Sequence, residues 1–179
     1  MSGQHAGRTG IPLADAGAAA ANSLAPRLAR RHLVAVLSSP LSRAPRTAEL
    51  AGLTGVRADS DLMEWDYGGC ESLTAAQPRR RGRAGTCAGT ASFPATPAIL
   101  ASSSSRWPRA DAALDRIRPL LNDGDVAVVA HGHLARVLTV RRLGLDVSAG
   151  RLLGHPHPGT LSFLATEDEQ PLIAAWNVP

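Results

Sequence analysis

Short apolar runs that alternate with segments of helical periodicity predict the architecture of this chain. Residues 126–130 read Val-Ala-Val-Val-Ala and residues 33–37 read Leu-Val-Ala-Val-Leu, with the length and β-branched content of buried parallel strands. Apolar positions spaced by three and four residues predict helices over 15–30, 41–53, 110–121 and 134–143. Strands that alternate with helices are typical of an α/β fold. We therefore expect a three-layer sandwich with a mostly parallel sheet flanked by helices.

The same pattern predicts the remaining connections. Two late strands are expected over 159–165 and 171–176, joined by an acidic turn at 167–169, and a connecting strand or loop over 57–62. Pro26 lies inside the first predicted helix and should kink or restart it. A chain of 179 residues is long enough to bury one core, so we interpret residues 1–179 as a single domain.

Periodicity is lost between residues 70 and 106. This stretch contains the basic run Pro78-Arg-Arg-Arg-Gly-Arg83 and is otherwise rich in Gly, Thr, Ala, Pro and Ser. It shows neither the period of a strand nor that of a helix, so we expect it to be irregular or disordered. A structureless loop of this length is unusual inside a compact domain.

Polar residues follow the predicted strands, where open α/β sheets bind their ligands. His131 and Gly132 come directly after one apolar run, and Arg43 lies in the first turn after the other. Glu64 belongs to a polar and aromatic loop, Met63 to Gly69. Arginine matches phosphate oxygens with a planar fork, and histidine can donate to a phosphoryl oxygen or attack phosphorus. A carboxyl group whose pKa is raised beside an anion can protonate a leaving oxygen.

Composition and charge narrow the expected partners. The formal net charge is +4 and all 19 basic residues are arginine, which suits an anionic ligand without indicating nucleic acid. The cationic candidate set lacks clustered carboxylates, so no metal or other cofactor is predicted. Cys70 and Cys87 form neither a metal-type spacing nor a disulfide framework. With no signal-peptide pattern and no membrane-length apolar run, the sequence predicts a cytoplasmic protein without membrane contact; a homodimer stays open.

The candidate residues lie in motifs that resemble those of the histidine phosphatase superfamily, also called phosphoglycerate-mutase-like. The resemblance runs in the family's order over residues 2–69 and 107–179. Its four motifs are the loop after the first family motif (7–13 with Gly17), the second motif (39–48, Ser-Pro-Leu-Ser-Arg-Ala-Pro-Arg-Thr-Ala), the acid/base loop (64–68, Glu-Trp-Asp-Tyr-Gly) and the second histidine motif (130–133, Ala-His-Gly-His).

The resemblance implies hydrolysis of a phosphomonoester through a phosphohistidine, as in the acid phosphatase branch. It implies that Arg43 clamps phosphate, that Glu64 donates a proton to the leaving group, and that His131 hydrogen-bonds the transferring phosphoryl group. Substrate-rim positions implied in the same way are Gly7, Tyr67 and Gly132. The expected ligands are a small phosphorylated metabolite or inorganic phosphate. Four further residues are interpreted as packing or surface groups: Arg8, His133, His155 and His157.

The chain departs from the family in two places. The family's nucleophile is the histidine of an Arg-His-Gly triplet that ends a central strand, and these 179 residues contain no such triplet. His5, between Gln4 and Ala6, follows no apolar strand and does not replace it. Residues 70–106 stand where the family has a helical cap. We therefore expect no turnover, and hypothesise a start codon placed too late and an out-of-frame stretch between Cys70 and Trp107.

Three other functions are compatible with parts of this pattern. A phosphoglycerate-mutase-like phosphotransferase is disfavoured because Arg8 and Gly10 stand where mutases tend to carry Trp and Asp. A non-catalytic phosphate-binding remnant would keep Arg43 and His131 without a nucleophile. A nucleic-acid binder acting through Arg79 to Arg83 is disfavoured because this run lacks interleaved aromatic residues.

Overall fold

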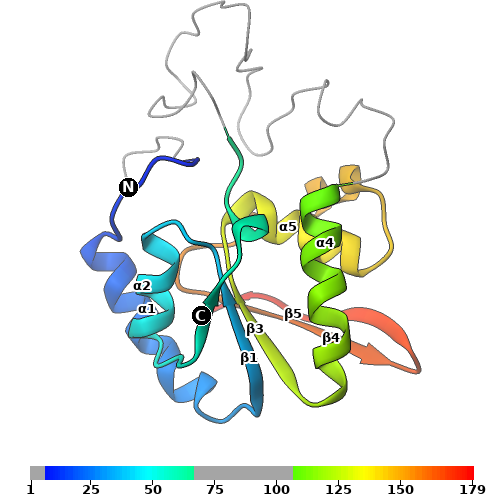
Figure 1. The fold of residues 1–179 in the computed structure, drawn as a ribbon, viewed down its shortest axis with the longest axis horizontal. Helices are drawn as coiled ribbons and strands as arrows, with labels where there is room; N and C mark the ends of the chain where they lie inside the picture. The colour runs from blue at the N-terminus through cyan, green and yellow to red at the C-terminus, as the bar shows by residue number, and fades with distance from the viewer. Residues whose placement is uncertain (1–6, 67–106) are drawn as a thin grey trace, which may run out of the picture.

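The computed structural model describes residues 7–66 and 107–179 (Figure 1). At its centre is a parallel sheet of three strands in the order β2-β1-β3. These strands are β1 (Leu33–Ser38), β2 (Val56–Ala58) and β3 (Asp125–Val129). Ser38 is in register with Val129, so β1 and β3 end side by side. The α/β class and the flanked parallel sheet predicted from the sequence are confirmed.

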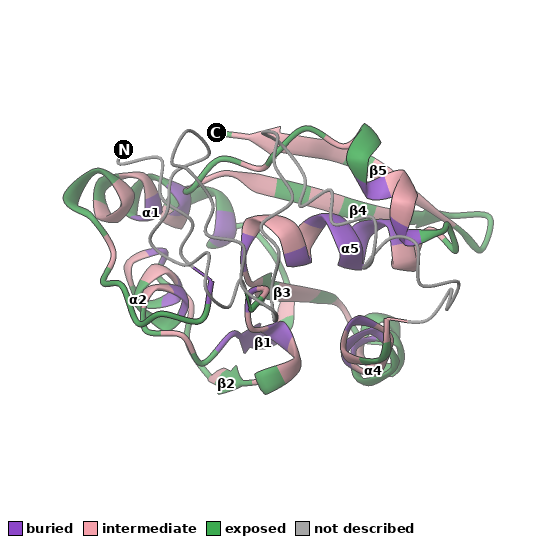
Figure 2. Cartoon of the chain, turned by 90° about the horizontal axis from the view of Figure 1, so that it is seen from above, coloured by how far each residue is buried: buried purple, intermediate pink, exposed green. Residues whose placement is uncertain are grey.

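Helices pack on both faces of this sheet. α1 and α2 cover one face, and α4 and α5 cover the other (Figure 2). The bounds are α1 Asp15–Leu28, α2 Arg43–Leu50, α4 Pro108–Ile117 and α5 Gly132–Arg142, with short 3-10 helices η1 Ser60–Leu62, η3 Arg118–Asn122 and η4 Val147–Leu152. Pro26 lies inside α1 without interrupting it. The predicted restart is therefore wrong: Pro26 removes one backbone hydrogen bond, but it lies two residues before the end of α1, so little of the helix has to continue beyond it.

The larger core cluster joins α4 and α5 to the sheet. Leu62 of η1 is completely buried in it, next to Leu37 of β1 and Leu134 of α5. A second, smaller cluster joins Leu24 and Leu28 of α1 to Ala51 after α2. Because Leu62 precedes the Glu64 loop by two residues, burial of this leucine fixes where that loop starts.

The C-terminal residues form a separate antiparallel hairpin. Its strands are β4 (Leu161–Glu167) and β5 (Gln170–Val178), as the alternating pattern predicts. The turn is made by Asp168 and Glu169, both with positive φ (47° and 64°). Leu161 packs against the α1 cluster, which places the hairpin beside α1.

Burial differs between the two predicted core strands. Residues 35–38 of β1 are buried, because β1 has a hydrogen-bonded neighbour on each side. Within the described residues β3 pairs only with β1, and Val128 is 37% exposed. The prediction that residues 126–130 form a buried strand is therefore correct for the strand and wrong for its burial. The prediction for 70–106 lies outside the described residues.

None of the helices in residues 7–66 and 107–179 combines the length and the apolar character needed to cross a membrane.

Candidate functional site

The site begins where β1 and β3 end. The backbone N–H of Ser39 donates to the Val129 carbonyl at 2.9 Å and so extends the β1–β3 pairing by one residue. His131 then leaves β3 with extended backbone and precedes α5 as its N-cap. Its Nε2 lies 2.8 Å from Ser39 Oγ, and both side chains are buried. Strand pairing therefore brings together two residues 92 positions apart in sequence.

The Glu64 carboxylate accepts hydrogen bonds from the backbone at the start of α5. Its Oε2 accepts a hydrogen bond from the backbone N–H of His133 at 3.2 Å, and its Oε1 accepts from that of Leu134 at 3.3 Å. Oε1 also accepts from the Trp65 N–H at 2.9 Å. The first amides of a helix lack intrahelical acceptors and favour negative charge, so this carboxylate acts as the cap of α5. His131 supplies no side-chain cap there.

Arginines of α4 hold the loop that carries Glu64. Arg109 Nη1 donates to the Met63 carbonyl at 2.8 Å. Arg116 Nη2 lies 2.8 Å from Asp59 Oδ2, at the N-cap of η1, and 2.6 Å from Asp61 Oδ2, within η1. Charge-assisted contacts of this kind fix the direction of a loop. The loop that carries Glu64 is thus held to α4 from Asp59 to Met63.

Arg43, the first residue of α2, holds the N-terminal loop. Its Nη2 donates to the Gly7 carbonyl at 2.7 Å and its Nη1 to the Thr9 carbonyl at 3.0 Å. The fork of the guanidinium therefore engages two backbone oxygens that point from the loop toward α2. The predicted rim residue Gly7 is buried beside Arg43 as a result.

Burial and two cations set the charge state of His131. Burial lowers its pKa to about 4, and the guanidinium groups of Arg43 and Arg109 act in the same direction against the opposing charge of Glu64. His131 is therefore neutral at pH 7, with one N–H and one unprotonated ring nitrogen. The charges of Arg43, Arg109 and Glu64 therefore all act on His131.

The Glu64 side chain is ionised at pH 7, because its pKa is lowered from the ordinary value. Burial by itself raises its pKa, but the hydrogen bond and charge of His133 and the Trp65 amide outweigh burial and hold the pKa below the ordinary value. Backbone N–H groups and His133 thus stabilise the carboxylate, which is 5% exposed. The predicted rise of this pKa depends on a bound anion and stays a prediction.

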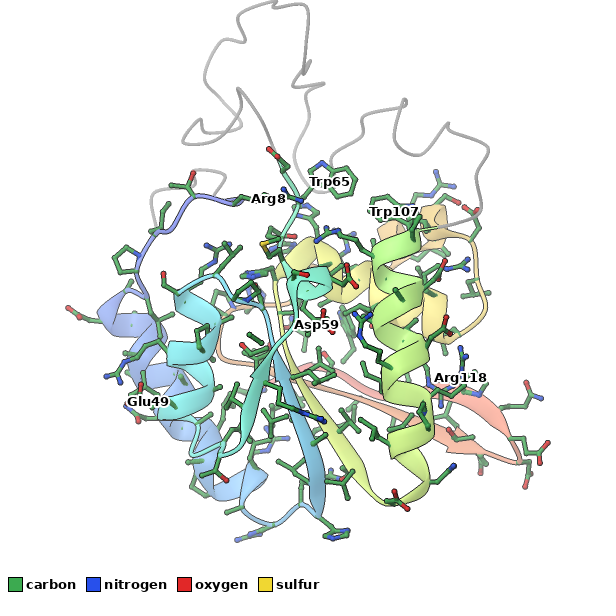
Figure 3. All side chains as sticks on the ribbon, viewed as in Figure 1. Arg8, Glu49, Asp59, Trp65, Trp107 and Arg118 are labelled. Carbon is green, nitrogen blue, oxygen red and sulfur yellow. The ribbon has the colours of Figure 1, made fainter. Side chains whose placement is uncertain are left out.

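Two tryptophans stand above this cluster, at the end of the molecule where the parallel strands finish (Figure 3). The rings of Trp65 and Trp107 have centroids 4.7 Å apart. Arg8 lies next to Trp65 in the same view, and its Nη1 is 3.8 Å from Asp66 Oδ2. Aromatic and basic groups thus lie at the end of the molecule where the parallel strands finish.

The structure brings most of the predicted site residues together. Arg43 starts the helix that follows β1, His131 and Gly132 start the helix that follows β3, and Glu64 accepts from the His133 amide in that helix. A Cβ at Gly132 would lie 2.5 Å from the His155 ring, so a side chain at this position would require that ring to move. Tyr67 lies outside the described residues.

Sequence reasoning missed two residues of this cluster, Ser39 and Arg109. The position of Ser39 in the sequence could have identified it, since it follows β1 as His131 follows β3. No such signal marks Arg109, because its role depends on how α4 packs against η1. His133 and His155 are predicted to be packing or surface groups, and their rings lie 5.4 Å apart beside Gly132.

This arrangement suits an anion. Two guanidinium groups and a neutral imidazole can direct N–H groups at phosphate oxygens, and the Glu64 carboxyl can exchange a proton. Among the residues that the structure describes, no three His, Cys, Asp or Glu side chains are grouped so as to hold a metal ion.

Comparisons with known proteins agree with this chemistry. The family model of the histidine phosphatase superfamily (branch 1) matches residues 1–179. An acid phosphatase of Mycobacterium tuberculosis (strain ATCC 25618 / H37Rv) is 32% identical over 156 residues, which cover 86% of this chain and 74% of the relative.

Solved structures show the same fold. The product of a Mycobacterium tuberculosis open reading frame is 27% identical, with a TM-score of 0.72 over 98% of this chain and 89% of the other. A mycobacterial glucosyl-3-phosphoglycerate phosphatase in complex with inorganic phosphate is 25% identical, with a TM-score of 0.71 over 98% of this chain and 91% of the other.

Proposed function

Since this chain belongs to the histidine phosphatase superfamily, we propose that its site is that of a phosphomonoesterase of the phosphohistidine type, and that these 179 residues bind phosphate without turning substrate over. The observation that carries the proposal is the placement of Arg43 at the start of α2, after β1, and of His131 and Glu64 at the start of α5, after β3. The bound species is a small phosphorylated metabolite or inorganic phosphate.

Each residue has a defined task in this proposal. The Arg43 guanidinium pairs with phosphate oxygens, which compete for the N–H groups that now hold Gly7 and Thr9. His131, neutral at pH 7, donates one N–H to a phosphoryl oxygen. The rim is formed by Gly7, Tyr67 and Gly132.

Glu64 is proposed as the proton donor to the leaving oxygen. In the ligand-free chain it is ionised, because its pKa lies below the ordinary value. A phosphate dianion beside it would raise that pKa by like-charge repulsion and allow it to take up the proton that it later donates. The acid role is thus tied to ligand binding.

The missing step is nucleophilic attack. Hydrolysis through a phosphohistidine requires a histidine that attacks phosphorus as the alcohol leaves, and then yields the phosphoryl group to water. The sequence holds no Arg-His-Gly triplet to supply it. The free edge of β3 within the described residues supports this proposal, since the resemblance puts the nucleophile's strand in the middle of the sheet.

The remaining features of the proposal concern the setting of the protein. We place it in the cytoplasm, without a cofactor or a nucleic-acid partner, and a homodimer is compatible with the proposal. The mycobacterial relative solved with inorganic phosphate supports phosphate as the first ligand to test.

The test combines turnover with binding. Purified chain is incubated with p-nitrophenyl phosphate, and its melting temperature is measured with and without inorganic phosphate. We expect phosphate to raise the melting temperature of the chain and of Arg46→Ala, but not of Arg43→Ala, with no turnover by any of them. Arg46 is an exposed residue of the same helix and serves as the matched control. Turnover that disappears in His131→Ala would show an active enzyme and contradict the inactive form; no stabilisation by phosphate would contradict the site.

A further inference from the structure

Ser39 occupies a position that the proposed mechanism does not use. It is 0% exposed and follows β1 directly. Its backbone N–H bonds to the Val129 carbonyl, two residues before His131. Because this backbone bond fixes the Cα of Ser39 beside the end of β3, its hydroxyl reaches His131 Nε2 at 2.8 Å without an adjustable loop.

The hydrogen-bond partners of the Ser39 hydroxyl determine which group donates in its bond to His131. A hydroxyl has one proton to donate and two lone pairs to accept with. One lone pair accepts from the Leu41 backbone N–H at 3.2 Å. In the described part of the chain, His131 Nε2 is the acceptor within reach of the hydroxyl proton. Leaving a buried hydroxyl proton without an acceptor is unfavourable, so the Ser39 hydroxyl donates and Nε2 accepts.

This direction determines the tautomer of His131. A neutral imidazole carries one proton, and if Nε2 accepts a hydrogen bond, that proton is on Nδ1. His131 is neutral at pH 7 because it is buried next to two guanidinium groups. Its side chain makes its hydrogen bond to the described residues through Nε2. The Nδ1–H group is then available to a ligand.

We propose that Ser39 is a positioning residue: its hydroxyl donates to Nε2 of His131 and thereby fixes the Nδ1–H tautomer, which offers that N–H to an oxygen of a phosphate bound beside Arg43. The opposite tautomer would present a lone pair to the anion and repel it. The ligand in this inference rests on the proposed function, whereas the tautomer does not.

Nuclear magnetic resonance tests the tautomer directly. Two-bond nitrogen–proton correlation of the histidine rings in 15N-labelled chain, at pH 7 without ligand, distinguishes a protonated ring nitrogen from an unprotonated one. We expect His131 protonated on Nδ1 in the wild-type chain and in Ser39→Thr, and a shift toward Nε2–H in Ser39→Ala. Ser42→Ala, an exposed serine of the same turn, should leave the spectrum of His131 unchanged.

Two outcomes of this measurement would overturn the inference. One is a wild-type His131 protonated on Nε2. The other is a folded Ser39→Ala chain with an unchanged His131 tautomer. The wild-type spectrum decides the first point even if Ser39→Ala does not fold.

Titration with inorganic phosphate by calorimetry tests the consequence for binding. Loss of one hydrogen bond of ordinary strength predicts a roughly five- to tenfold weaker phosphate affinity for Ser39→Ala. Ser42→Ala should stay within about twofold of wild type. Equal affinity of wild type and Ser39→Ala would overturn the positioning role. No binding of phosphate by wild type would instead contradict the proposed function and leave the tautomer result standing.

Discussion

The Glu64 carboxylate lies over the first turn of α5 and accepts the backbone N–H of His133 at 3.2 Å, so a residue of the acid/base loop also caps the helix that begins at the site. The two residues are 69 positions apart in the sequence. A change in the protonation of Glu64 therefore acts on α5 as well as on any ligand. The stability of α5 and the proposed proton transfer therefore both depend on the Glu64 side chain.

Removing this cap should destabilise the chain measurably. Glu64→Ala leaves the His133 and Leu134 amides without their acceptors, and we expect a loss of about 1–2 kcal/mol in the free energy of unfolding. Glu64→Gln keeps one oxygen acceptor and should cost less. Urea unfolding at pH 7 measures both. Glu49→Ala, whose side chain is 68% exposed, should stay within about 0.5 kcal/mol of wild type. Equal stability of Glu64→Ala and wild type would show that the cap contributes nothing.

Mild acid should destabilise the chain through His131. Its pKa is about 4 in the folded chain, against 6.5 ordinarily, so between these values the unfolded chain binds more protons. The contribution is complete above pH 6.5 and is lost as the pH falls toward 4; over the full range it corresponds to about 3 kcal/mol. Urea unfolding at several pH values from 7 to 5 should show the first part of this loss.

The variant His131→Gln should flatten that pH dependence, because glutamine does not titrate. The exposed His32→Gln should keep the wild-type slope. A slope unchanged by His131→Gln would assign the acid sensitivity to another group.

The loop that Arg43 holds should open when the guanidinium is removed. Arg43→Ala loses the hydrogen bonds to the Gly7 and Thr9 carbonyls, and the peptide bond after Arg8 becomes accessible to trypsin. We expect cleavage there to accelerate roughly tenfold, as followed by mass spectrometry, in line with the loss of about 1.4 kcal/mol of local stability. Arg46→Ala is the control, since its side chain pairs with Glu49 at the surface. Equal cleavage rates would show that Arg43 does not anchor the loop.

Two arginines near the end of α4 should differ in their effect on stability. Arg116 contacts both Asp59 and Asp61, which are 11% and 27% exposed, whereas Arg118 pairs with Asp115 at 67% exposure on both sides. We expect Arg116→Ala to cost about 1 kcal/mol and Arg118→Ala less than about 0.5 kcal/mol in urea unfolding. The larger effect should shrink when the salt concentration is raised. The reverse order would show that the Arg116 contacts do not hold η1.

The local pattern of the sequence predicts the elements of this fold well. β1, β3 and the four helices arise from apolar spacing, and Arg43 and His131 are recognisable because each follows a strand. The edge position of β3 is not predictable in this way, since it depends on which strands pair with it. The capping role of Glu64 was also not foreseen, because it depends on tertiary contact with α5.

Ser39 marks a further limit of sequence reasoning. The sequence shows the residue type and its position after a strand. The contact between its hydroxyl and His131, however, arises from the β1–β3 register. A serine after a strand is common, and only the pairing distinguishes this one. Residue type and spacing therefore predict Arg43, Glu64 and His131 as site residues, but they do not single out Ser39.

The edge of β3 has a consequence for the behaviour of the protein in solution. Within residues 7–66 and 107–179, β3 pairs on one side only, and an apolar strand with an unpaired row of backbone groups is a template on which another polypeptide can add a strand. We expect the chain to aggregate as its concentration rises, with β3 as the nucleus of intermolecular sheet formation. Val128→Arg, which places a charge on this strand at a residue already 37% exposed, should raise the solubility limit in concentration-dependent light scattering.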